Sequence, residues 1–348
     1  MSSTSDIAES TTAAVGHDVA DRSIRLQSVV GRWLMFTDYG AAAQRHMAIV
    51  WSCALACGLA DAIILPNSRL SFASSNWTGL LEGIACCALA GTFITIASSR
   101  LRSDPNRAAA VLRTALVVTE LLFRAALPIG VLLTAGVTLT YLITSADPPL
   151  RDALLANIDR ALGFDWLRLL DATNSSPFLA ALLARVYQTI GPVAELVIIW
   201  LALTRHGERL AEFIAILGLS TVGLCVGTWL VPAAGAFAYY EPLPQHFANF
   251  AAFGDMWPFA RTFTMLRNGS LSVIDLSALD GVVSFPSFHT VLGVMTVYAL
   301  RDTIWLVIPV LLLNAAMIVS TMPVGGHHLI DVLAGAGLTL GAILFVRR

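Results

Sequence analysis

The sequence contains no lysine, so all 21 of its basic residues are arginines. Charged residues of both signs make up only 13% of the chain, whereas soluble globular proteins carry about 25%. The hydrophobic content is 57%. This composition argues against a soluble globular domain and is typical of a polytopic membrane protein.

A zinc or haem motif and a signal peptide are also missing. The five cysteines lie inside apolar runs at spacings that match no zinc or haem pattern, so we interpret them as small buried apolar residues. Residues 1–31 are polar and rich in Ser and Thr, without the apolar stretch of a signal peptide. We predict that they form a disordered tail and that the first membrane span acts as the insertion signal.

Apolar runs of near-spanning length recur along the chain, judged against the roughly 20 residues that a helix needs to cross a bilayer. Only helices satisfy their own backbone in lipid, so the sequence predicts an all-α, polytopic membrane helix bundle with about eight spans. Segments 108–125 and 149–172 mix charged and apolar residues, and we interpret both as interfacial amphipathic helices. The predicted spans are 46–65, 79–98, 127–145, 178–204, 209–231, 288–300, 303–322 and 328–346.

The positions of the arginines predict the orientation of these spans. If the spans alternate, one face receives the arginines that flank the first two spans, those between the fourth and fifth, Arg301, and the terminal pair Arg347 and Arg348. Positive residues accumulate in the cytoplasm, so we expect that face to be cytoplasmic. The opposite, outer face then holds the long loop 232–283, which we expect to be ordered over the membrane surface.

Two histidine-containing phrases open predicted spans at this outer face. The first is Ser284-Phe285-Pro286-Ser287-Phe288-His289, and the second runs from Gly325 to Asp331 as GGHHLID. Pro286 and Ser287 suit a helix start. Gly325 and Gly326 permit a tight turn close to a ligand. Because helix N-termini offer free N–H groups and a partial positive charge, we expect both openings to favour a phosphate.

The pair His327 and Asp331 carries the predicted chemistry. Four residues apart, they share one helix face, so the carboxylate is able to accept the N–H of one imidazole nitrogen and leave the other free as a nucleophile. His289 is then the candidate general acid. An aspartate one turn into an apolar span is costly and usually functional, although the phrases also admit a bland interpretation as polar helix starts.

These phrases resemble two motifs of the type 2 phosphatidic acid phosphatase superfamily. FPSFH resembles its P-S-x-H motif. STMPVGGHHLID resembles its last motif, S-R-x5-H-x3-D, with Ser320, His327 and Asp331 at the matching positions. The combination is most similar to the branch that contains inositol phosphorylceramide synthases, over about 150–348.

The resemblance implies a lipid phosphatase or phosphotransferase with a six-helix-type core and a metal-independent mechanism. In it His327 forms a phosphohistidine, Asp331 orients His327, and His289 is first acid and then base. No cofactor, metal or nucleic acid is expected. The expected partners are a phospholipid or lipid phosphate, a lipid hydroxyl acceptor where the group is transferred, and the inner (plasma) membrane. The expected organisation is a cytoplasmic tail (1–31), N-terminal membrane spans (32–145) and a catalytic membrane domain (146–348).

The sequence departs from the superfamily pattern at its phosphate-binding cations. The K-x6-R-P motif is absent, and Thr321 stands where the last motif has arginine. A transferring phosphoryl group needs cationic stabilisation, so we expect an outer arginine, Arg267 or Arg185, to replace them. Ser287, Gly326 and Tyr187 are further candidates for the phosphate-binding site.

The sequence leaves two questions about function open. Water as acceptor makes the protein a lipid phosphate phosphatase, and a lipid hydroxyl makes it a phosphotransferase; branch resemblance favours transfer. A membrane transporter is the alternative from another class, because residues such as Asp61, Glu82 and Glu195 lie within apolar runs. No inverted repeat supports it.

Overall fold

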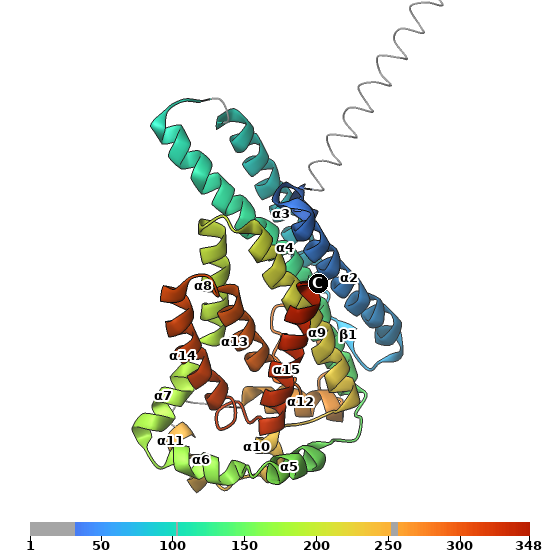
Figure 1. Ribbon diagram of the computed structural model, residues 1–348. Coiled ribbons are helices and arrows are strands. Elements are labelled where there is room, and N and C mark those ends of the chain that lie inside the picture. The colour runs from blue at the N-terminus through green and yellow to red at the C-terminus, as the bar shows by residue number, and fades with distance from the viewer. Residues whose placement is uncertain (1–31, 102–103, 252–256) are drawn as a thin grey trace, which may run out of the picture.

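The computed structural model describes residues 32–101, 104–251 and 257–348; the predicted disordered tail, 1–31, lies outside this range. The described part is a helical bundle with one short parallel strand pair (Figure 1). Its longer helices are α2 (Gly40–Ile64), α3 (Ser75–Leu101), α4 (Arg107–Ser145), α5 (Asp152–Ala161), α6 (Trp166–Asn174), α7 (Pro177–Tyr187), α8 (Ile190–Leu203), α9 (Gly207–Leu230), α12 (Pro258–Asn268), α13 (Phe288–Ala299), α14 (Ile304–Ser320) and α15 (Leu329–Val346). The shorter elements are η1 (Thr37–Tyr39), η2 (Leu65–Asn67), α10 (Ala236–Tyr240), η3 (Pro244–Phe247), α11 (Ala248–Ala251), β1 (Ser71–Phe72) and β2 (Val273–Ile274).

The all-α, polytopic architecture predicted from the sequence is confirmed. Within the described ranges, five helical segments are long and apolar enough to cross a membrane: the segment around α2, and α3, α4, α9 and α15. Helices α7 and α8, bent by 43° at a short break, together make a sixth. The predicted spans 288–300 and 303–322 correspond to the shorter apolar helices α13 and α14.

The prediction of a separate interfacial helix at 108–125 is wrong. That segment is the first half of α4, which continues through Pro128 to Ser145. Its charges do not end the helix because they find partners in the segment before α2: Arg124 holds Asp38 at 2.6 Å, and Glu120 lies 3.3 Å from Arg32. Paired in this way, charged residues are tolerated inside an otherwise apolar helix.

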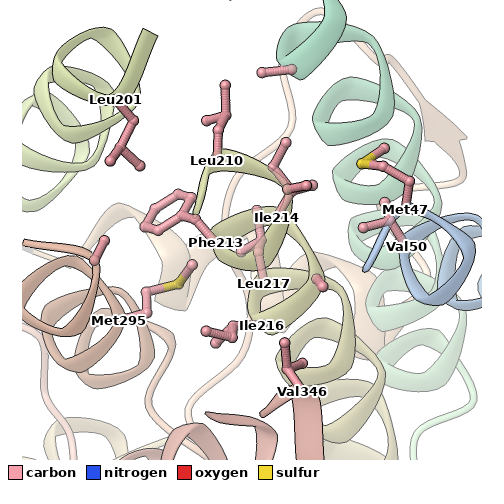
Figure 2. Close-up of a cluster of buried hydrophobic side chains, with 14 of the residues drawn as sticks. Met47, Val50, Leu201, Leu210, Phe213, Ile214, Ile216, Leu217, Met295 and Val346 are labelled. Atoms are coloured by element: carbon pink, nitrogen blue, oxygen red, sulfur yellow. The ribbon is translucent and has the colours of Figure 1, made fainter. Parts of the chain in front are cut away.

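Helix α9 is at the centre of the bundle. Figure 2 shows Leu210, Phe213, Ile214 and Leu217 of α9 surrounded by side chains from α2, α8, α13 and α15. Leu210 and Ile214 are completely buried. The first half of α9 is thus a core segment, whereas Val226, Trp229 and Leu230 near its end are exposed. It therefore fixes the positions of the helices that carry the histidine phrases.

The two ends of the bundle differ in construction. At one end α3 and α4 project beyond the other helices (Figure 1), and Arg209 pairs with Asp302 while Arg301 pairs with Glu212. The other end is covered by α5, α6 and α10–α12 (Figure 1). There β1 pairs with β2, so the loop after α2 is tied to the long loop 232–283. The starts of α13 and α15 lie beneath this cover.

Candidate active site

The starts of α13 and α15 bring two histidines together. Helix α13 begins at Phe288 after Ser287, whose hydroxyl accepts the N–H of Thr290 at 3.4 Å. Helix α15 begins at Leu329, directly after the GGHH turn. The ring centroids of His289 and His327 lie 6.2 Å apart. Two residues separated by 38 positions in the sequence therefore face one site.

The carboxylate of Asp331 orients His327. Its Oδ2 lies 3.3 Å from Nδ1 of His327 and also accepts the N–H of His328 at 2.9 Å and the hydroxyl of Ser284 at 3.0 Å. Asp331 is completely buried. With Nδ1–H donated to this carboxylate, Nε2 of His327 carries the free lone pair that a nucleophile requires.

Helix α5 holds the start of α15 through Asp159. The two oxygens of this buried carboxylate accept the N–H groups of Leu329 and Ile330, each at 2.9 Å. A carboxylate at a helix N-terminus satisfies otherwise unpaired donors and interacts favourably with the helix dipole. The segment 149–172 is thus two helices, α5 and α6. Helix α5 supports the turn that carries His327, and we call this support, which begins with Asp159, the brace.

A second aspartate of α5 completes this brace. Asp152 accepts the N–H groups of Ala234 and Gly235 at 3.0 and 2.8 Å. The imidazole of His328, completely buried, lies between the carboxylates, 3.6 Å from Asp152 and 3.4 Å from Asp159. Burial alone lowers the pKa of His328, but the neighbouring carboxylates outweigh it and raise that pKa to about 9. A charged His328 therefore joins α5 to the α15 turn at neutral pH.

This arrangement corrects the expectation that both helix starts offer free N–H groups to a phosphate. At α15 the N–H groups of His328, Leu329 and Ile330 are already bonded to Asp331 and Asp159. These carboxylates occupy the place that a phosphate would take at this helix terminus. The start of α15 is built to position His327 rather than to bind an anion.

Tyr187, at the end of α7, contacts His289. Their rings stack at a centroid distance of 4.4 Å with 19° between planes. A Cβ placed on Gly325 would lie 3.0 Å from the Tyr187 ring and 2.6 Å from the carbonyl oxygen of Thr321. Gly325 is thus required by close packing, and Gly326 by its φ of +68°. Tyr187 packs between the turn before α15 and the ring of His289.

The predicted phosphate-binding residues differ in where the structure places them. Tyr187 lines the cavity beside the two histidines. Of the two glycines, Gly325 lines the cavity and the predicted Gly326 does not. Ser287 is completely buried as the cap of α13. Arg267 pairs with Asp147 at 2.6 Å and donates to the carbonyl of Pro148 at 2.9 Å. Arg185 is exposed, and neither arginine lines the cavity.

Among the described residues, no group of three or more His, Cys, Asp and Glu side chains is arranged to hold a metal ion. What the site does contain is an imidazole beside a buried carboxylate, His327 with Asp331, and a second imidazole, His289, on the same cavity. Such an arrangement suits covalent catalysis with a separate acid and base.

The family of the chain follows from a comparison with known protein families. A model of the PAP2 superfamily matches residues 153–345, more than half of the chain. The chain belongs to the PAP2 superfamily. No curated protein and no solved structure matches it. Membership supports a membrane-associated lipid phosphatase or phosphotransferase.

Three residues of this PAP2 protein's site were missed in the sequence: Asp152, Asp159 and His328. Asp152 and Asp159 are seven residues apart, two turns of one helix face, which was a signal that both side chains point the same way. Their partners are about 80 to 170 residues away in the chain. No local pattern indicates a contact at that separation.

Proposed function

We propose that this PAP2 protein is a membrane enzyme that cleaves or transfers a lipid phosphoester group through a phosphohistidine at His327. One observation carries the proposal: His327, oriented by Asp331 at 3.3 Å, faces His289 across a shared cavity. No metal is needed for this chemistry, since the imidazole supplies the nucleophile and the second histidine handles the proton.

The first step forms the phosphoenzyme. The lone pair on Nε2 of His327 attacks phosphorus while the bond from phosphorus to the leaving oxygen breaks. A protonated His289 gives its proton to that oxygen. The positive charge that develops on the His327 ring is stabilised by Asp331, which receives the Nδ1–H hydrogen bond.

The second step releases the phosphoryl group. The neutral His289 takes a proton from the incoming hydroxyl, whose oxygen attacks phosphorus as the phosphorus–nitrogen bond breaks. Water as acceptor gives a phosphatase, and a lipid hydroxyl gives a phosphotransferase. We propose the phosphotransferase, of the inositol phosphorylceramide synthase type, on the similarity of the FPSFH and GGHHLID motifs, with lipid phosphate hydrolysis as the alternative.

For the cation that contacts phosphate we propose Arg185 over Arg267. Arg267 is engaged by Asp147 and Pro148. Arg185 is exposed at the end of α7, two residues before Tyr187, and its side chain has no partner within the described residues. A guanidinium without a partner is available to a substrate headgroup without breaking an existing ion pair.

The test is to incubate purified protein with phospholipid labelled in the phosphate, with and without ceramide, and to identify the products. Labelled protein that survives alkali but loses its label in acid, together with turnover in excess EDTA, is the expected result. Complete inhibition by EDTA that added Mg²⁺ or Zn²⁺ reverses contradicts the histidine mechanism. Labelled inorganic phosphate as the sole product with ceramide present excludes transfer to ceramide.

We also propose that the site faces outward from the inner membrane, because the ends of α13 and α15 remote from it carry Arg301, Arg347 and Arg348. The test places a single cysteine at Ala248 in the covering loop or at Thr303 at the opposite end, in protein without native cysteines. A membrane-impermeant thiol reagent on intact cells is expected to label the first and spare the second. The reverse pattern places the site in the cytoplasm.

A further inference from the structure

A cavity of about 290 Å³ extends from the catalytic histidines into the helical bundle. At one end it is lined by His289, His327 and Tyr187. At the other end its walls are α4, through residues that include Val137 and Thr140, and α9, through residues that include Thr221 and Cys225. The reacting end and the α4–α9 end are thus parts of one continuous space.

The α4–α9 end of the cavity offers almost nothing to a polar ligand. The hydroxyl of Thr140 donates to the carbonyl of Val137 at 2.7 Å, and that of Thr221 donates to Leu217 at 2.9 Å. The Cys225 thiol lies 3.6 Å from the carbonyl oxygen of Gly136. Among the residues that the structure describes, no Arg, Asp or Glu lines the cavity. A sugar or other polyol there would lose its hydrogen bonds to water without replacement, so the space suits a hydrocarbon chain.

Helix α4 lies outside the part of the chain that the family model covers, which begins at residue 153. It nevertheless supplies the wall that faces α9. The two helices are in close contact at Gly136, where an added Cβ would lie 2.4 Å from the Cγ2 methyl of Thr221. This contact fixes the separation of the two walls, because any larger residue at position 136 requires them to move apart.

Resting on the proposed function, we propose that the hydrocarbon chain of the substrate lipid lies between α4 and α9 and that α4 sets which chain is accepted. The phosphoester then reaches His327 from a lipid whose apolar part is enclosed by the protein. Selectivity in this view depends on Val137, Gly136 and Thr140 of the N-terminal region, as much as on residues beside the histidines.

The test fills the cavity from α4 and compares two substrates that differ only in chain length, dioleoyl and dibutyryl phosphatidic acid. Val137→Trp projects an indole into the cavity; the matched control is Val131→Trp on the same helix, where Val131 is 44% exposed on the outside. We expect the ratio of kcat/KM for dioleoyl over dibutyryl phosphatidic acid to fall at least tenfold in Val137→Trp and to stay as in wild type in Val131→Trp. An unchanged ratio in Val137→Trp overturns the proposal.

A second measurement requires no turnover and no tryptophan. In protein whose five native cysteines are replaced by Ala, Val137→Cys presents a thiol on the cavity wall to N-ethylmaleimide. Dioleoyl phosphatidic acid is expected to slow this labelling at least fivefold, and dibutyryl phosphatidic acid to leave it unchanged. Equal labelling rates with and without the dioleoyl lipid overturn the chain site. Protection without any phosphoryl transfer instead supports the chain site and contradicts the proposed function.

Discussion

The starts of α13 and α15 each carry a histidine of the site, yet they are held in different ways. The α15 start is fixed by hydrogen bonds: Asp159 takes two of its N–H groups, and Asp331 takes a third together with the ring of His327. The α13 start is capped by the hydroxyl of its own Ser287, whose N–H donates to the carbonyl of Asp331 at 3.0 Å, and the ring of His289 rests against Tyr187. The ring of His327, the proposed nucleophile, is thus held by a hydrogen bond to Asp331, while the ring of His289, the proposed acid, is held by a stacking contact that leaves its nitrogens able to exchange protons with different partners.

The sharpest test of this difference removes each histidine in turn. His327→Ala is expected to lower turnover by roughly 10⁴-fold or more, because the nucleophile itself is lost, and to leave no label on the protein. His289→Ala is also expected to lose most turnover, but to retain label on His327, because loss of a shared acid and base slows the two steps unequally. Turnover and acid-quenched labelling are measured together. Wild-type rates in His327→Ala contradict the central role given to that residue.

The next largest effect is expected from Asp159→Asn. The carboxylate of Asp159 accepts two N–H groups of the α15 start. The side-chain oxygen of asparagine accepts one of them, and its NH₂ group faces the other N–H as a second donor. The α15 start therefore loses about 3 kcal/mol of stabilisation. A displacement of His327 of about 1 Å is then expected to lower kcat about 100-fold. The matched control is Asp165→Asn, at the cap of α6, where asparagine caps equally well. Equal melting temperatures and rates in the two variants contradict the brace.

A pH series separates the charge of His328 from its packing. The pKa of His328 is raised to about 9 in the folded protein, above its ordinary value near 6.5. The stability that this charge contributes is therefore complete below about pH 6.5 and is lost as the pH rises through about 9. His328→Gln is expected to melt below wild type at pH 6.5 and alongside it at pH 9.5. A constant difference across this range shows that packing, and not charge, holds the brace.

The smallest effect is expected at the α13 start. Tyr187→Leu removes the aromatic partner of His289, and a stacked pair contributes about 0.5 to 1.5 kcal/mol. We expect kcat to fall about 3- to 10-fold, with Tyr187→Phe close to wild type because it keeps the ring. An equal loss in both variants assigns the effect to the phenol hydroxyl and contradicts the stacking role.

What the sequence predicts well is whatever depends on neighbours in the chain. His327 and Asp331, four residues apart, meet because one helix turn requires it, and the apolar runs locate the helices. Ion pairs between residues far apart in the chain could not be predicted from the sequence. Arg124 and Glu120 suggested an interrupted helix, since their partners Asp38 and Arg32 could be identified only in three dimensions.

The same limit explains the phosphate-binding arginines. The position of Arg267 in the sequence made it a candidate for phosphate binding. Its guanidinium instead forms an ion pair with Asp147, which is far away in the chain. The free N–H groups expected at α15 were likewise taken by Asp159, from a helix that the sequence placed only at an interface. An electrostatic role cannot be assigned from one residue until its opposite charge has been located.

Because α4 runs without a break from Arg107 to Ser145, it has the geometry of a lever with its fulcrum at the close contact between Gly136 and Thr221. Arg113 is about 35 Å from that fulcrum along the helix, and Thr140 only about 6 Å, at 1.5 Å per residue. A tilt of about 10° therefore moves the far arm by about 6 Å and the cavity wall by about 1 Å. A movement of that size at the α3–α4 projection would thereby be scaled down to an adjustment on the order of one carbon–carbon bond at the cavity wall.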